Sequence, residues 1–365
     1  MVYRVIGLMS GSSLDGLDIV FTEIQESAGK WNYEILQADC YPYPAEWIKK
    51  LQGAISLPAL EYQLLHTDYG HYLGQQVNRF LEENQLQYKV ALVASHGHTT
   101  FHVPSRRMTA QLGDGAAIAA TTQLPVVTDL RSMDIALGGQ GAPIVPIGEK
   151  LLLHQYDLFL NLGGIANISF RSDNYIAFDI CAANRVLNML AADAGKEYDE
   201  GGKMAAGGNI NTSLLEKLEG LEYYRQPWPK SLANDFGTDI VYPLIKKSGC
   251  SIKDALRTYT EHISRQIKNS ITAVNVFKPQ TSNLKLLCTG GGAFNDFLVE
   301  RLRSHLDGLH IELVIPEENL VKYKEALIMG LIGLLRWREE TNVLSSVTGA
   351  ARDSVGGAMW MGQEE

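Results

Sequence analysis

The sequence predicts an α/β protein built from two related halves. Apolar residues in 5–9 and 17–24 flank a turn rich in glycine and serine, as in a β-hairpin. The stretches 157–162 and 165–170 repeat that arrangement around a second glycine turn, an architectural echo of the first. Residues 90–94 are all apolar, which is typical of a short strand buried on both faces of a sheet. The α/β assignment depends on these three observations.

The length of 365 residues suits two domains. We expect a first domain over 1–145 and a second over 146–365, with the C-terminal helix free to pack back towards the first. Lys and Arg total 32 against 41 Asp and Glu, for a net charge of −9. This balance argues against nucleic acid or an anionic membrane surface as a partner. A homodimer is left open.

The chain carries no pattern of a secreted or membrane-spanning protein. Its four cysteines show no CxxC spacing, so we expect free thiols in a reducing compartment. No signal peptide pattern opens the sequence, and the longest apolar stretch, 326–335, is too short to span a bilayer. These features predict a cytoplasmic protein.

The remaining elements follow from periodicity and from glycine and proline punctuation. In the first half we expect strands at 31–43, 90–94 and 125–128, and helices at 47–55, 60–83 and 111–124. In the second half we expect strands at 157–162, 165–170, 175–180, 284–289 and 311–315, and helices at 183–194, 213–218, 252–277, 293–305 and 323–338. Ser251 is the expected N-cap of the long helix at 252–277.

The first turn combines a backbone suited to an anion with two carboxylates. Its glycines let a ligand approach the backbone closely, and free N–H groups in such a turn can bind phosphate. Asp15 and Asp18 lie beside it, and a bridging Mg²⁺ would reconcile these acids with phosphate. A plain hairpin turn with a solvated acid is the alternative. The residues expected to bind a nucleotide here are Gly11, Ser12, Ser13, Leu14, Asp15, Gly16, Leu17 and Asp18.

Two further glycine turns follow strands in the second half. Gly163 and Gly164 end the strand at 157–162, and Gly290, Gly291 and Gly292 precede a helix N-terminus, a favourable place for phosphate. The sequence contains neither a Walker motif nor G-x-G-x-x-G, which disfavours P-loop and Rossmann binding. We therefore expect a phosphate-binding cleft between two related halves, clamped by hairpin turns.

Several side chains are candidates for chemistry. Asp179 stands between Phe178 and Ile180, and an acid on an apolar strand is costly unless it has a function or a partner. Arg131 follows a strand next to a glycine loop, so it is either a salt-bridged structural residue or a clamp for carboxylate or phosphate. His96, His98 and His102 could suggest a metal, but no further ligand cluster follows them, and we interpret them as hydrogen-bonding residues of a polar cleft.

Read together, these motifs resemble the anhydro-N-acetylmuramic acid kinase family, almost from end to end. The matching segments are 7–18, Ser95-His96-Gly97, 129–134, 138–143, 161–167, 290–293, 324–326 and 347–350. The resemblance implies the actin, hexokinase and Hsp70 superfamily fold, with two ribonuclease-H-like domains and an ATP cleft between them.

The resemblance also implies an activity: an ATP- and Mg²⁺-dependent kinase that opens 1,6-anhydro-N-acetylmuramic acid with water and phosphorylates O6. The product would be N-acetylmuramic acid 6-phosphate, in murein recycling. Asp179 matches the catalytic base of the family, and Asp15 would serve the metal. Thr99, Arg131 and Glu325 are expected on the sugar side, and Asn167 joins the glycine turns on the nucleotide side.

The sequence departs from the family around the sugar and the base. Ile180-Cys181-Ala182-Ala183 stands where Thr-Gly-Pro-Gly is usual, His98 replaces a Gln, and Asn234-Asp235 replaces an Arg-Glu pair. Two alternatives therefore stay open: a kinase of another amino sugar or anhydrosugar, and a nucleotide-binding sensor that has lost catalysis. Retention of Asp179 and Glu325 argues against the sensor.

Overall fold

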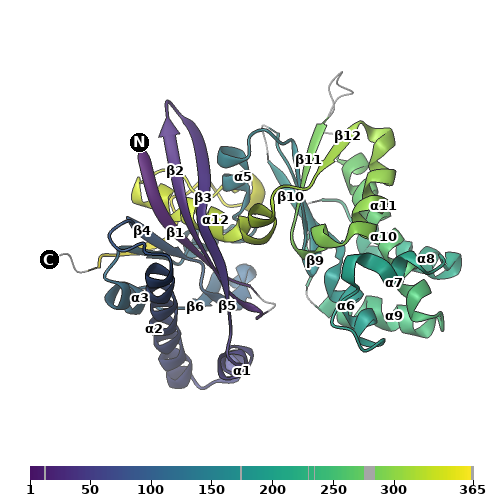
Figure 1. Cartoon of the computed structure of the whole chain (residues 1–365), viewed down its shortest axis with the longest axis horizontal. Coiled ribbons are helices and arrows are strands. Elements are labelled where there is room, and N and C mark those ends of the chain that lie inside the picture. Colours follow the sequence, from purple (N-terminus) through teal and green to yellow (C-terminus); the bar gives the residue numbers. More distant parts are fainter. Residues whose placement is uncertain (12–13, 173–174, 229, 234, 275–283, 363–365) are drawn as a thin grey trace. The chain divides into compact units, whose positions relative to one another are not determined.

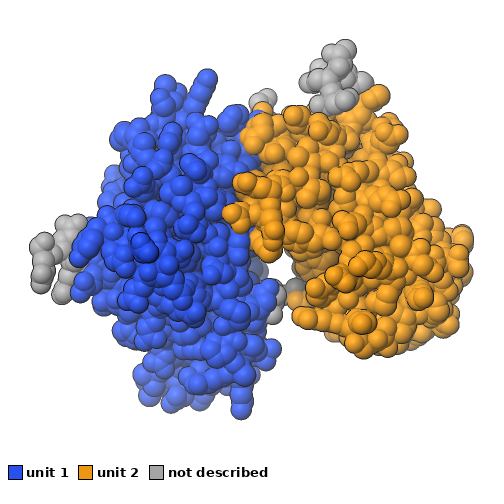
Figure 2. Space-filling model, viewed as in Figure 1, with its two compact units in different colours: residues 1–154, 323–365 blue, residues 155–322 orange. Residues whose placement is uncertain are grey.

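The computed structural model describes residues 1–11, 14–172, 175–228, 230–233, 235–274 and 284–362. The chain divides into two compact units (Figure 2). Unit 1 comprises Met1–His154 and Tyr323–Glu365, and unit 2 comprises Gln155–Lys322. Within the described residues, no helix is both long enough and apolar enough to cross a bilayer.

Unit 1 is built on a six-stranded sheet in the order β13-β7-β4-β1-β2-β3. Three consecutive strands run antiparallel, and β4 and β7 are parallel to β1. The short β13 adds to β7 in the antiparallel sense. The strands are β1 (Val2–Ser10), β2 (Gly16–Ser27), β3 (Lys30–Pro42), β4 (Leu92–Ser95), β7 (Val126–Thr128) and β13 (Ala358–Trp360).

Unit 2 repeats this topology in a five-stranded sheet of order β10-β9-β8-β11-β12, of which Figure 1 labels β9, β10, β11 and β12. Its first three strands are again consecutive and antiparallel, and the last two are parallel to the first. The strands are β8 (Leu158–Leu162), β9 (Ile165–Phe170), β10 (Ile176–Ala182), β11 (Leu284–Thr289) and β12 (Ile311–Val314). The repeated strand order confirms the expectation of two ribonuclease-H-like halves.

The sheet of unit 1 is covered on both faces because β2 alternates. Ile19 and Phe21 belong to a core shared with Tyr69 and Leu73 of α2, whereas Val20 packs with Ala326 of α12. The helices are α1 (Ala45–Gly53), α2 (Ala59–Glu83), α3 (Gly115–Thr122), α4 (Ser132–Ala136), α5 (Pro146–Leu152), α12 (Glu318–Trp337) and α13 (Ser345–Thr348), with short η1 (Ala54–Ser56) and η2 (Pro104–Arg106).

The helix α12 packs so closely on β1 and β4 that glycine is required at the contact. A Cβ on Gly7 would lie 1.8 Å from the carbonyl oxygen of Ala326, and one on Gly333 would lie 2.4 Å from the Cβ of Ala94. The C-terminal segment therefore groups with unit 1; the sequence had placed it in a second domain over 146–365, with its helix free to pack back towards the first. Residues 146–154 also group with unit 1, so the division falls later than residue 145.

Unit 2 has its core between the sheet and α10, where Tyr259, Ile263 and Ile267 are fully buried. The N-cap is the expected Ser251, whose Oγ accepts from the backbone N–H of Asp254 at 3.2 Å. The helices are α6 (Asn184–Ala192), α7 (Lys203–Ala206), α8 (Thr212–Glu219), α9 (Tyr242–Lys247), α10 (Ile252–Ala273) and α11 (Asp296–Leu306). Shorter turns are η3 (Glu200–Gly202), η4 (Glu222–Arg225), η5 (Phe236–Val241), η6 (Gly291–Phe294) and η7 (Asp307–Leu309).

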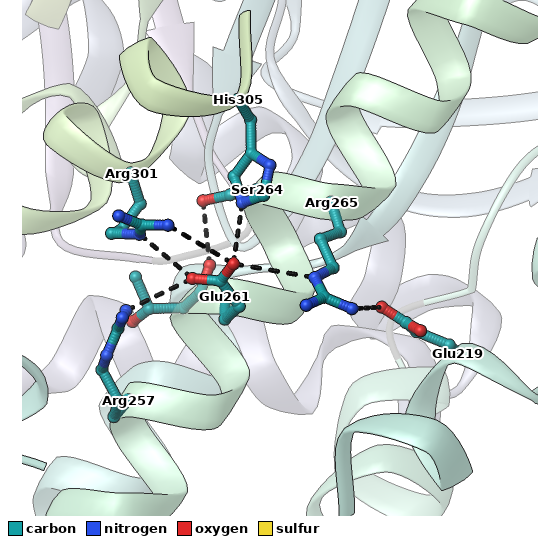
Figure 3. Close-up of polar contacts among 8 residues, drawn as sticks. Glu219, Arg257, Glu261, Ser264, Arg265, Arg301 and His305 are labelled. Carbon is teal, nitrogen blue, oxygen red and sulfur yellow. Dashed lines mark hydrogen bonds and ion pairs between the residues drawn. The ribbon is translucent and has the colours of Figure 1, made fainter. Parts of the chain in front are cut away.

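One buried carboxylate ties the helices of unit 2 together (Figure 3). Glu261 of α10 is 3% exposed, and its side chain accepts from Arg301 Nε at 3.0 Å and lies 2.8 Å from His305 Nε2, both on α11. Arg257 donates to the same carboxylate at 3.3 Å, and Arg265 links it to Glu219 of α8. These contacts link α10 to α8 and α11 through the side chain of one acid, Glu261.

Some predicted elements differ from the structure. A hairpin of β5 (His98–Val103) and β6 (Met108–Leu112) precedes α3. The end of β6 overlaps the start of the helix that we expected at 111–124. The helix α3 starts only after Asp114, whose carboxylate accepts from the N–H of Ala117 at 2.9 Å and caps it. The helix expected to 277 ends at Ala273, and residues 275–277 lie outside the described residues. The short β13 was not predicted.

Candidate active site

The first glycine turn joins β1 to β2 in unit 1. Gly16 requires glycine, because a Cβ there would lie 2.6 Å from Cys40 Sγ and 2.8 Å from the carbonyl oxygen of Tyr41. Leu14 has a φ of 58°, and its N–H points back to the carbonyl of Gly11 at 3.4 Å. Leu17 is buried in the core. Ser12 and Ser13 lie outside the described residues.

Asp18, beside this turn, is affected by the charges of two other acids, Asp15 and Glu325. Asp15 is exposed and its Oδ1 accepts from the N–H of Gly16 at 3.0 Å, whereas Asp18 is half-buried on β2. Burial raises the pKa of Asp18, a hydrogen bond with the Cys40 thiol lowers it, and the charges of Asp15 and Glu325 raise it, so that the pKa reaches about 7. An acid with so little compensating charge would be stabilised by a bound cation.

The turn offers carboxylate oxygens, which are the ligands that Mg²⁺ prefers. Asp15 and Asp18 are the residues that fit such an ion, and a metal that keeps several waters needs only one or two protein carboxylates. In the part of the chain that the structure describes, no group of three or more His, Cys, Asp or Glu side chains is arranged to hold a metal.

Arg131 lies in the turn that follows β7 and is held by two uncharged acceptors. Its Nε donates to His96 Nε2 at 2.8 Å, and its Nη1 donates to the carbonyl of Gly141 at 2.6 Å. Burial lowers the pKa of Arg131 to about 10, against the opposing charges of Glu325 and Asp134. Glu325 on α12 thus acts on both Arg131 and Asp18 through space.

The glycine loop at 138–141 is fixed by Asp134 and by a residue from the far end of the chain. The Asp134 carboxylate accepts from the N–H of Gly141 at 2.7 Å and from the Thr348 hydroxyl at 2.6 Å. The N–H of Gln140 donates to the carbonyl of Thr348 at 2.8 Å. These contacts explain why the C-terminal motif at 347–350 accompanies the motifs of the first half.

The three histidines have separate partners. His96 contacts Arg131, His98 Nδ1 lies 3.2 Å from Ser10 Oγ, and His102 Nδ1 lies 3.1 Å from Thr109 Oγ1. Thr99 is exposed on β5, and its hydroxyl accepts from the Gln111 amide at 3.3 Å. Each histidine thus makes its own hydrogen bond.

In unit 2 the structure brings the other two glycine turns together. The amide of Asn184, at the start of α6, donates to the carbonyl of Leu162 at 2.8 Å, and its backbone N–H donates to the carbonyl of Gly163 at 3.1 Å. A Cβ on Gly292 would lie 2.7 Å from the Cβ of Leu162 and 3.0 Å from Asn184 Oδ1. Gly164 lies beside Arg185, whose Nε would be 3.8 Å from a Cβ there.

The neighbouring Gly290 also needs to be glycine. It has a φ of +83°, and a Cβ would lie 2.6 Å from Asn161 Oδ1. Gly291 is exposed and has more room. Asn167 stands opposite Asn161 in the β8–β9 register and opposite Asp179 in the β9–β10 register. The glycine turns, Asn167 and Asp179 therefore occupy one end of the unit 2 sheet.

Asp179 on β10 is a half-buried acid with one defined donor. Its Oδ2 accepts from the N–H of Leu232 at 2.9 Å, and its own N–H donates to the carbonyl of Lys230 at 3.1 Å. The hydroxyl of Tyr223 donates to its carbonyl oxygen at 2.6 Å. Burial raises its pKa, while the Leu232 hydrogen bond lowers it. Among the described residues, Oδ1 has no hydrogen-bond partner.

The departure at 180–183 leaves this frame intact. The β9–β10 register shifts between Asp179 and Cys181, so the strand carries a bulge directly after the acid. Ala183, in place of a glycine, still donates its N–H to the carbonyl of Gly164 at 2.8 Å. The backbone contacts that join β10 to the glycine turn are thus made without the usual residues.

The predicted site residues fall into two sets. Unit 1 holds Gly11, Leu14, Asp15, Gly16, Leu17, Asp18, Thr99, Arg131 and Glu325, and unit 2 holds Gly163, Gly164, Asn167, Asp179, Gly290, Gly291 and Gly292. The sequence interpretation missed the roles of His96, Asp134 and Thr348, although all three stand in its motifs. The Leu232 N–H has no sequence signal, because a backbone donor can come from any residue but proline.

Two ribonuclease-H-like units, each with a glycine turn after its first strand, define a two-domain α/β protein of this fold type. The chain belongs to the anhydro-N-acetylmuramic acid kinase family, whose model matches residues 3–362, and it is a kinase.

An anhydro-N-acetylmuramic acid kinase of Sulfurovum sp. is 32% identical, covering 98% of this chain and 99% of that protein. One of Gloeobacter violaceus is 33% identical, covering 95% and 96%. Component A of the Acidaminococcus fermentans (R)-2-hydroxyglutaryl-CoA dehydratase aligns with a TM-score of 0.45 and 14% identity, covering 91% and 97%.

Proposed function

We propose that this chain phosphorylates 1,6-anhydro-N-acetylmuramic acid with ATP and Mg²⁺, opening the anhydro ring with water. The observation that carries the proposal is the carboxylate of Asp179. One oxygen is held by the Leu232 N–H and the other has no partner among the described residues. A fixed, half-buried carboxylate with a free oxygen is suited to accept a proton from water.

The proposed reaction has two steps, and each forms one bond and breaks another. Water attacks the anomeric carbon and gives a proton to Asp179, and the bond from that carbon to O6 breaks. The released O6 attacks the γ-phosphorus, the bond to the ADP leaving group breaks, and N-acetylmuramic acid 6-phosphate results. Such a product would enter cell-wall murein recycling in the cytoplasm. Mg²⁺ would supply positive charge at the phosphates, and Asp15 and Asp18 are the residues to hold it.

The binding roles that we propose depend on what surrounds the site residues of each unit. The backbone N–H groups of the glycine turns would hold the phosphates, since the protein atoms nearest to a Cβ at Gly164 and Gly291 would be 3.8 Å and 3.6 Å away, which leaves the backbone there open to a ligand. Arg131 would meet the lactyl carboxylate of the sugar, because its present acceptors leave its positive charge uncompensated. Glu325 and Thr99 would serve the same substrate.

The test is Asp179→Asn, which keeps the shape and the acceptor for Leu232 but cannot take up a proton. We expect turnover to fall at least about 10⁴-fold, the upper end for loss of a general base, because ring opening also depends on water activation. ATP affinity, measured by calorimetry, should stay within about twofold of wild type. A wild-type protein inactive on every anhydro- and reducing amino sugar offered would favour the sensor, and activity on another sugar alone would change the substrate. Joint loss of ATP binding and thermal stability in Asp179→Asn would assign Asp179 a structural role.

A further inference from the structure

Arg131 is a cation whose hydrogen-bond acceptors carry no charge. His96 Nε2 lies 2.8 Å from Nε, and the carbonyl of Gly141 lies 2.6 Å from Nη1. Among the described residues, Nη2 has no hydrogen-bond partner and no carboxylate forms an ion pair with the guanidinium. The acids Glu325 and Asp134 act on it only through space. The guanidinium is thus fixed in position while most of its charge stays available to a ligand.

The hydrogen bonds of His96 determine its tautomer. A carbonyl oxygen can only accept, so the 2.8 Å contact between Nδ1 and the Gly97 carbonyl places the proton on Nδ1. Nε2 therefore carries the lone pair that Arg131 Nε–H needs. His96 is 4% exposed, and burial together with the charge of Arg131 lowers its pKa to about 3. The ring is neutral at physiological pH, and its acceptor is always present.

A carboxylate in place of His96 would hold Arg131 equally well but would neutralise it. The buried ion pair of Lys324 and Glu149, at 3.1 Å in the same unit, shows that alternative. A cation paired in that way has little attraction left for a second anion. A neutral imidazole avoids this neutralisation, because it orients the guanidinium of Arg131 without cancelling its charge.

We propose that His96, through its neutral Nε2, is the positioning residue that aims Arg131 at a carboxylate of the substrate. The inference rests on the proposed function for the identity of that substrate. It adds that recognition of the anionic sugar depends on a group that does not touch the sugar. His96 acts on Arg131 alone, so its loss should affect sugar binding and leave the nucleotide turns unchanged.

A matched pair of substitutions separates the two ring nitrogens. The amide of His96→Asn reaches the place of Nδ1, which keeps the donor to Gly97 and removes the acceptor for Arg131. The amide of His96→Gln reaches the place of Nε2 and keeps that acceptor. His71→Gln is the control, because His71 is exposed on α2 and contacts Thr121. The measurements are kcat, KM for 1,6-anhydro-N-acetylmuramic acid, KM for ATP and the melting temperature.

We expect His96→Asn to raise the KM for the sugar by about 10- to 100-fold, the range for losing a hydrogen bond to a charged group. The KM for ATP should stay within about twofold, and His96→Gln should restore most of the sugar affinity. His96→Asn should also lose much of the preference for this sugar over 1,6-anhydro-N-acetylglucosamine, which lacks the lactyl carboxylate. Equal sugar KM values in the two variants, or a change confined to the melting temperature, would overturn the inference.

An NMR measurement on the wild-type protein tests the role of His96 independently of the proposed function. In ¹⁵N NMR of histidine-labelled wild-type protein we expect a protonated Nδ1 and an unprotonated Nε2 for His96, with a coupling to Arg131 Nε–H. A protonated Nε2 would overturn the positioning role even in an active kinase. An inactive wild type with the expected NMR signals would overturn the proposed substrate, and the sugar-specific part of the inference with it.

Discussion

The hairpin turns at 11–15 and 163–164 occupy the same place in their sheets, yet they differ in chemistry. The first follows β1, carries Asp15, and is followed on β2 by Asp18, whose pKa is raised to about 7 by burial and neighbouring acids. The second follows β8, has two glycines and no acid, and lies beside Arg185. The repeated topology places a turn at both positions, and we propose that the side chains make the first turn a site for a cation and the second a site for an anion.

The surroundings of the two turns differ as well. Gly16 cannot accept a side chain, because β3 passes directly behind it with Cys40 and Tyr41. Gly164 would accept a Cβ with nothing closer than 3.8 Å. Glycine is therefore needed at the first position for packing, and the structure gives no packing reason for it at the second. The comparison teaches that a glycine without a steric reason is the stronger sign of a ligand.

The largest effect on stability that we expect concerns the scaffold of unit 2. Glu261→Gln should lower the free energy of unfolding by about 3–5 kcal/mol, because it removes the buried charge that pairs with the partly buried Arg257 and Arg301. Burial raises the pKa of Glu261, but the hydrogen bonds and charges of Arg301 and His305 outweigh burial and hold that pKa below its ordinary 4.5. Its contribution to stability is thus present above about pH 4.5 and is lost as the pH falls through the lowered value.

Glu219→Gln is the matched control for this prediction. Its pair with Arg265 is much more exposed, at 31% and 41%, so the expected change is only about 0–1 kcal/mol. Chemical denaturation at pH 7, followed with hydrogen exchange, measures both variants. Equal stability of the two would show that the Glu261 network does not hold unit 2 together.

A smaller effect should distinguish the two turns directly. Gly16→Ala should cost about 1–3 kcal/mol of stability, because its methyl group overlaps Cys40 and Tyr41. Gly164→Ala should change stability by less than about 0.5 kcal/mol and weaken ATP binding about tenfold, since the methyl group would stand where phosphate approaches. Denaturation and ATP calorimetry test both. Unchanged ATP affinity in Gly164→Ala would remove the second turn from the phosphate site.

One substitution in the first turn should increase stability. Because the folded protein raises the pKa of Asp18 from 3.8 to about 7, folding binds a proton more tightly there, and stability falls as the pH rises between these values. Asp18→Asn removes the buried charge, so stability at pH 8 should rise by about 1–2 kcal/mol and the fall between pH 4 and pH 7 should weaken. The Mg²⁺ concentration needed for half-maximal turnover should rise. A variant that is less stable and has an unchanged Mg²⁺ requirement would contradict the cation role of this turn.

Much of the scaffold could be predicted because its signals are local. Apolar segments around a glycine turn in 5–24 and in 157–170 predicted both hairpins, and the apolar run at 90–94 predicted β4. The acid on β10 could be recognised because burying a carboxylate is costly. These signals need only neighbouring residues, so they are present in the sequence.

Other features depend on contacts between distant segments. Nothing local to Gly7 shows that Ala326 of α12 lies against it, so the sequence allowed the C-terminal helix to pack back towards the first domain without showing where it would pack. The contact of Thr348 with Asp134 and that of His96 with Arg131 also join separate segments. The hairpin β5–β6 was missed because its bulge between Thr99 and Phe101 interrupts the alternation.

The central claim is that a carboxylate on β10 activates water for attack on the sugar. The most direct test is a single reaction with 1,6-anhydro-N-acetylmuramic acid, Mg·ATP and water labelled with ¹⁸O, with the product analysed by mass spectrometry and ¹³C NMR. We predict one ¹⁸O at the anomeric hydroxyl and none in the phosphate, with the same pattern in the residual product of Asp179→Asn. Label in the phosphate, or an unlabelled anomeric hydroxyl in a product analysed before exchange with solvent, would contradict the account.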